Sequence, residues 1–76
     1  MKYDHSYLAF FALKRFGTLK AFAEGVGIST RRLYAILNDA EDWRADEIGR
    51  IVRVLNISAD FVDITFFMHR IEPHEP

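Results

Sequence analysis

Residues 16–39 read FGTLKAFAEGVGISTRRLYAILND, and this stretch determines the fold. Ala23 is small, so a second helix can approach closely at that position. Gly27 follows four residues later, and glycine adopts a positive φ at no steric cost, which predicts a tight turn. Apolar residues recur at helical spacing around this pair, at Leu19, Phe22, Val26, Ile28, Leu33 and Ile36. The pattern predicts two packed helices joined by a short turn.

Capping residues mark the start of both helices. Thr18 precedes the first, and Ser29 precedes the second, which we expect to cover residues 30–37. A hydroxyl at such a position accepts a hydrogen bond from a backbone N–H of the first turn. Helix, glycine turn and helix at this spacing constitute the helix-turn-helix motif.

The flanking sequence supplies further helices. Residues 7–16 predict a helix that Asp4 or Ser6 caps and Gly17 ends. Another helix begins near Asp46 and Glu47, two acids that favour a first turn because of the helix dipole. Its apolar stripe consists of Ile48, Ile51, Val52 and Leu55.

A short fifth helix follows the break at residues 56–58, with Phe61, Val62 and Ile64 apolar. Residues 65–71 are rich in β-formers, which predicts an extended arm or short strand. The predicted organisation is one domain over residues 1–65, followed by a C-terminal arm and tail over 66–76.

Composition excludes several classes of protein. With 76 residues, the chain is too short for a deep catalytic cavity beside a stable core, so we do not expect an enzyme. Cysteine is absent, and the histidines share no metal-ligand spacing with the carboxylates, so we expect no cofactor or metal. No apolar run approaches the roughly 20 residues of a membrane span, and no secretion signal is visible. The expected location is the cytoplasm, away from membranes.

Residues 16–39 resemble the phage repressor and Cro class of helix-turn-helix domains, also called the XRE or lambda-repressor-like class. The resemblance continues through DEIGRIVRVLNI at residues 46–57 and FF-x-x-x-I at 66–71, and covers about residues 6–71. The ending is similar to small Cro-like regulators of phages and mobile elements of Gram-positive bacteria. The resemblance implies an all-α, five-helix lambda-repressor-like domain with a short C-terminal extended arm or strand.

In that family a recognition helix, here at about residues 29–38, places its N-terminal residues against base edges in the major groove. The resemblance implies that bases are faced by Thr30, Arg31 and Ala35, and the DNA backbone by Ser29, Arg32, Tyr34 and Asn38. Residue chemistry agrees for Arg31, whose guanidinium can pair bidentately with guanine O6 and N7. Arg32 and Lys20 are expected to contact phosphates.

Two positions depart from the family pattern. Leu19 stands where a glutamine commonly helps to hold a phosphate, and Asp39 stands where glycine is frequent. Asp39 is therefore expected to bring an acid close to the DNA backbone. Both departures lower the expected affinity for DNA.

The sequence thus predicts a sequence-specific transcriptional regulator that binds a double-stranded operator and needs no small-molecule ligand. One small domain cannot easily bury every apolar residue of the arm, Phe66, Phe67, Met68 and Ile71. We therefore expect a homodimer that uses this arm, the alternative being that the arm folds back on its own core. The alternative function is a protein–protein interaction module that keeps the fold without binding DNA.

Overall fold

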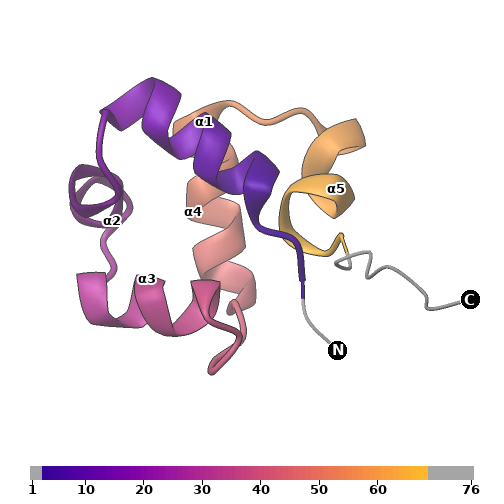
Figure 1. Cartoon of the computed structure of the whole chain (residues 1–76). Helices are drawn as coiled ribbons and strands as arrows, with labels where there is room; N and C mark the ends of the chain where they lie inside the picture. Colours follow the sequence, from indigo (N-terminus) through magenta and orange to yellow (C-terminus); the bar gives the residue numbers. More distant parts are fainter. Residues whose placement is uncertain (1–2, 69–76) are drawn as a thin grey trace, which may run out of the picture.

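Local sequence signals place the ends of most helices in the computed structural model, which describes residues 3–68. These residues form an all-α domain of helices wrapped around one core (Figure 1). The elements are α1 (Ser6–Phe16), α2 (Leu19–Val26), α3 (Thr30–Leu37), α4 (Ala45–Leu55), the 3-10 turn η1 (Ala59–Phe61) and α5 (Val62–Phe66). The predicted all-α helix-turn-helix fold is confirmed, and the described part of the chain contains no strand.

The predicted caps of α2 and α3 are present. Thr18 Oγ1 accepts a hydrogen bond from the backbone N–H of Ala21 at 3.1 Å, and Ser29 Oγ accepts one from Arg32 at 3.0 Å. At α1 the predicted N-cap residue, Asp4 or Ser6, is wrong by one position. His5 occupies the N-cap position, and its side chain makes no capping hydrogen bond. The Asp4 carboxylate accepts from the Ser6 backbone N–H at 2.9 Å instead.

The core lies where α1, α2, α4 and α5 meet, with α3 closing it from below in the view of Figure 1. Ala23 is fully buried, as expected for a close approach of two helices. The buried apolar residues are Leu8, Ala12, Phe22, Ala23, Val26, Leu33, Ile51, Ile57 and Phe66, joined by Ile36 beside the cluster.

Gly25 has a packing role that the sequence did not predict. It lies inside α2, and a Cβ built on it would come within 2.5 Å of the Phe16 ring. The missing side chain therefore lets the Phe16 ring rest directly on the α2 backbone.

The C-terminal segment differs from the prediction at Phe66. This residue belongs to α5 rather than to an extended arm, and its side chain is only 1% exposed. Its ring meets Trp43 edge-on, with centroids 5.9 Å apart, and this burial outweighs the β-propensity of the local sequence. Phe66 therefore folds back onto its own domain and is not available to a second chain.

Beyond α5 the two ends of the described chain meet, since the Asp4 backbone N–H donates to the Met68 carbonyl at 2.6 Å. The rest of the predicted arm and tail, residues 69–76, lies outside the described residues. Within residues 3–68, no helix combines the length and apolar character that crossing a bilayer requires.

Candidate nucleic-acid interface

The α2–turn–α3 unit has the arrangement that the motif predicts. In Figure 1, α2 is seen nearly end-on whereas α3 runs across the lower edge, so the two helices cross steeply. Gly27 takes the left-handed conformation, with φ +77°. The next residue, Ile28, then donates its backbone N–H to the Ala23 carbonyl at 3.0 Å and closes the turn.

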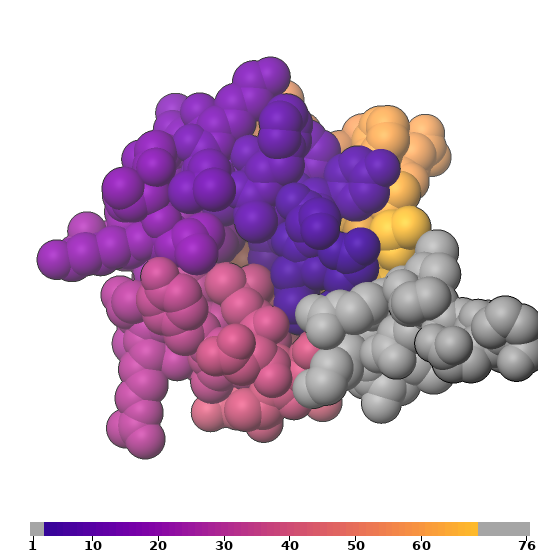
Figure 2. Space-filling model, viewed as in Figure 1, coloured from indigo at the N-terminus to yellow at the C-terminus, as the bar shows by residue number. Residues whose placement is uncertain are grey.

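The predicted base-facing residues lie along the first two turns of α3. Arg31 is exposed, whereas Thr30 and Ala35 are half-buried. No ion pair joins the Arg31 side chain to any other residue between positions 3 and 68. In Figure 2 the magenta atoms of α3 form the lower left of the surface. The Arg31 guanidinium is therefore available to a ligand.

The residues predicted nearer the DNA backbone surround this face. Ser29 caps α3 and is exposed, Tyr34 is 47% exposed, and Asn38 is the exposed C-cap residue. Lys20 is exposed in the first turn of α2. These side chains are thus exposed at both ends of α3, in its second turn and in the first turn of α2.

Arg32 does not have the position expected of a phosphate contact. Its guanidinium is bidentate on Glu47, with Nε to Oε2 at 2.6 Å and Nη2 to Oε1 at 2.8 Å. Nη1 donates to Glu41, and Nη2 also donates to the Asp42 carbonyl at 2.9 Å. Through these hydrogen bonds Arg32 ties α3 to α4.

Glu47 lies in the first turn of α4, as predicted, but its burial and its pairing with Arg32 were not predicted. It is 4% exposed, and Oε1 also accepts the backbone N–H of Arg44 at 2.8 Å. The hydrogen bond from Arg32 lowers the pKa of Glu47, against the opposing effect of its burial. The pKa of Arg32 is raised in turn. A sequence signal existed, since Glu47 lies one helical turn before the fully buried Ile51 and therefore on the buried face of α4.

Asp39 sits in a left-handed conformation, with φ +62°. That conformation favours glycine, although aspartate tolerates it. Its Oδ1 lies 3.3 Å from His5 Nε2 and accepts the Tyr3 backbone N–H at 3.4 Å. With a side chain 11% exposed, Asp39 is turned toward the N-terminal segment and is not an open acid beside α3.

Arg44 is a cation that sequence reasoning did not select. It is exposed and immediately precedes α4, whose first turn lies beside α3 because Glu47 binds Arg32. In Figure 1 the lower end of α4 reaches the same edge as α3. Arg44 therefore joins Arg31 as an exposed cation near this edge.

Within residues 3–68, no cluster of three or more His, Cys, Asp or Glu side chains is arranged to hold a metal ion. The chemistry that this surface offers is hydrogen bonding and charge pairing from Arg31, Lys20 and Arg44, together with the polar groups of Ser29 and Asn38. Such groups suit recognition of a polyanion.

Comparison with known proteins gives one family. A family model described as "Protein of unknown function (DUF739)" matches residues 1–69. No curated protein matches the chain.

Proposed function

We propose that this chain, which belongs to the DUF739 family of proteins of unknown function, is a sequence-specific DNA-binding transcriptional regulator of the repressor/Cro type. The observation that carries the proposal is the contrast between two consecutive arginines. Arg32 is tied to α4 through Glu47, whereas Arg31 projects from the same turn without an ion-pair partner among the described residues. A cation held out from a fixed helix is suited to reading a base edge.

The first turn of α3 supports the same function. Ser29 caps the helix and leaves its N-terminal end at the surface, where backbone N–H groups and the helix dipole favour a phosphate. Arg44, whose backbone N–H binds the Glu47 partner of Arg32, adds an exposed positive charge near this end, and Lys20 is exposed in the first turn of α2. Base reading by Thr30, Arg31 and Ala35 would be accompanied by backbone contacts from Ser29, Tyr34 and Asn38.

The mechanism is occupancy of an operator. Two copies on a pseudo-symmetric site would place their recognition helices about 34 Å apart, one turn of DNA. A bound dimer would then exclude polymerase or a competing repressor. A regulator of this kind acts in the cytoplasm of a bacterium and is encoded by the chromosome, a phage or a mobile element.

Selection from a random duplex library at about physiological salt tests this function. The enriched duplex and a scrambled duplex are then titrated at several salt concentrations. We expect the enriched site to bind at least about 10³-fold more tightly, with affinity falling steeply as salt rises. Equal, weak binding to both duplexes would overturn the proposal.

One observation favours a second candidate, a protein-binding module that keeps the fold without binding DNA. The outer face of α1 exposes three large apolar side chains, Tyr7, Phe10 and Leu13, and Phe10 is 59% exposed. Contiguous exposed apolar side chains of this kind mark contact surfaces for other proteins. A flat salt dependence of any nucleic-acid binding would favour this candidate over the regulator.

A further inference from the structure

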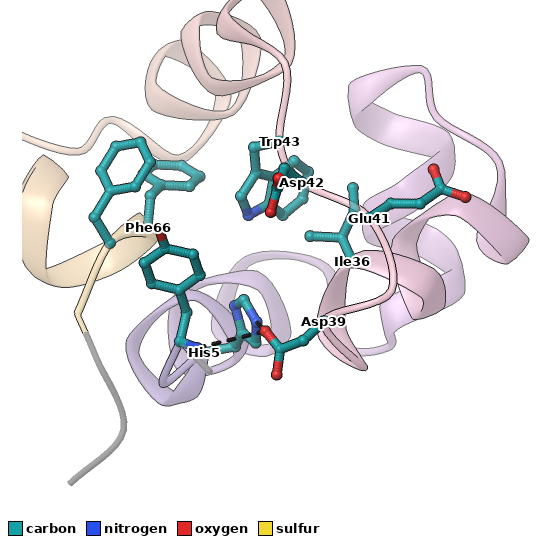
Figure 3. Close-up of a pocket in the computed structure, with 9 residues that line it drawn as sticks. His5, Ile36, Asp39, Glu41, Asp42, Trp43 and Phe66 are labelled. Atoms are coloured by element: carbon teal, nitrogen blue, oxygen red, sulfur yellow. Dashed lines mark hydrogen bonds and ion pairs between the residues drawn. The ribbon is translucent and has the colours of Figure 1, made fainter. Parts of the chain in front are cut away.

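A cavity of about 240 Å³ lies between the start of α1, the loop that joins α3 to α4, and α5 (Figure 3). Aromatic and aliphatic side chains form much of its wall, from Tyr3, Ile36, Trp43, Phe66 and Phe67. An apolar cavity of roughly 150 Å³ is already large enough to hold benzene. The space can therefore accommodate a ligand with a six-membered ring.

Two buried nitrogen atoms of this wall have no hydrogen-bond partner among the described residues, His5 Nδ1 and Trp43 Nε1. The His5 side chain is 10% exposed, so water in bulk does not replace the missing partner. An unpaired buried polar atom costs free energy, and natural proteins retain few of them. In Figure 3 the His5 ring and the Trp43 indole enter the space from opposite sides.

The two nitrogen atoms have complementary hydrogen-bonding requirements. His5 Nε2 lies 3.3 Å from Asp39 Oδ1, so Nε2 carries the proton in the neutral ring and Nδ1 is an acceptor. Trp43 Nε1–H can only donate. A group that both accepts and donates a hydrogen bond would satisfy both atoms, as a hydroxyl or a primary amide does.

We propose that this cavity binds a small uncharged ligand with a ring-sized apolar body and a hydroxyl or primary amide head. The oxygen of the head accepts a hydrogen bond from Trp43 Nε1–H. The O–H of the hydroxyl, or an N–H of the amide, donates a hydrogen bond to His5 Nδ1. The apolar body packs against Phe66 and Ile36 in the part of the cavity that a single water would leave empty, since water takes up only about 30 Å³.

Charge in the wall excludes other ligand classes. Two acidic residues line the same cavity and disfavour an anionic head: Asp42, and Asp39, whose Oδ1 lies 3.3 Å from His5 Nε2. An ammonium head has no acceptor for the Trp43 N–H and would leave that donor unpaired. An uncharged head therefore fits better than either ion.

The test uses benzamide and benzyl alcohol as probes on the whole chain in the absence of DNA, so its result does not depend on the proposed function. Trp43 is the single tryptophan of the chain, which makes its fluorescence and its indole N–H resonance reporters of this cavity. We expect saturable changes in the roughly millimolar range that ligands of this size reach. Toluene, which lacks the head, and benzoate, which is charged, are expected to bind at least tenfold more weakly.

Trp43→Phe keeps an aromatic ring and removes the donor, so benzamide binding followed by backbone resonances should weaken at least fivefold. His5→Phe removes the acceptor and should also weaken benzamide binding at least fivefold. This second variant provides the test if Trp43→Phe does not fold. Phe10→Ser, on the outer face of α1, is the matched control and should leave binding unchanged. No saturable change with either headed probe, equal binding of toluene, or full binding by a folded Trp43→Phe variant would overturn the proposal.

Discussion

Arg32 and Glu47 form a bidentate pair that joins the first turn of α3 to the first turn of α4, with contacts of 2.6 and 2.8 Å. The Glu47 carboxylate also accepts a hydrogen bond from the backbone N–H of Arg44. One buried group therefore fixes both the start of α4 and the position of α3 against it. The orientation of the proposed recognition helix thus depends on a residue outside the helix-turn-helix motif.

Glu47→Gln should destabilise the domain by about 1–3 kcal/mol. The glutamine amide can accept a hydrogen bond from Arg32 only at its oxygen, and its NH₂ group would face an Arg32 N–H, so two donors would be left without an acceptor. Urea unfolding measures the change. Glu41→Gln is the control, since the Glu41 side chain is 51% exposed and its pair with Arg32 is screened by solvent. Equal losses in the two variants would contradict the structural role given to Glu47.

The pH dependence of stability should carry the signature of Glu47. Its pKa in the folded chain is lowered below the ordinary value of 4.5, chiefly by the hydrogen bond from Arg32. Its contribution is therefore fully present above about pH 4.5 and is lost as the pH falls through the lower folded value. The difference in unfolding free energy between the wild type and Glu47→Gln should be large at pH 7 and shrink toward pH 3. A difference that stays constant over this range would show that the Glu47 charge does not stabilise the fold.

Local signals were sufficient for most of the fold. The bounds of α3, the caps at Thr18 and Ser29 and the left-handed Gly27 all follow from residues a few positions apart, and the structure contains each of them. Phe66 was misplaced for the opposite reason. Its burial depends on Trp43, which lies 23 positions earlier in the chain, and no local pattern reports such a contact.

The candidate site was predicted less completely than the fold. Position along α3 identified which side chains face outward, but two adjacent arginines look alike in sequence. Only the fold places Glu47 and Glu41 around Arg32 and leaves Arg31 open. Asp39 is a similar case, because its contacts are with Tyr3 and His5 at the other end of the domain.

Arg31→Ala should weaken binding to the selected operator by about 1–3 kcal/mol and relax the preference at one base position. Repeating the duplex selection with the variant measures both effects. Arg53→Ala, which removes the same charge from an exposed position in the last turn of α4, is the control and should leave affinity nearly unchanged. A uniform loss on all sequences would instead make Arg31 a phosphate contact.

Phe66→Ala should cost about 3–5 kcal/mol of stability, because it removes a fully buried ring and leaves a cavity against Trp43. Phe67→Ala, the neighbouring change at a side chain that is 43% exposed, should cost much less. Thermal unfolding of both variants measures the difference. Similar, small losses would indicate that Phe66 lies in a peripheral arm, as its sequence context suggests.

Two glycine substitutions should shift stability in opposite directions. Gly27→Ala places a Cβ in open space, yet it forces a left-handed residue at φ +77°, so we expect a loss of about 1–2 kcal/mol. Gly49→Ala lies inside α4, where the new Cβ would meet only Arg53 Nη1 at 3.9 Å. Alanine has the higher helix propensity, so this variant should gain up to about 1 kcal/mol. Denaturant unfolding compares the pair, and a gain at Gly27 or a clear loss at Gly49 would contradict the turn and helix assigned to them.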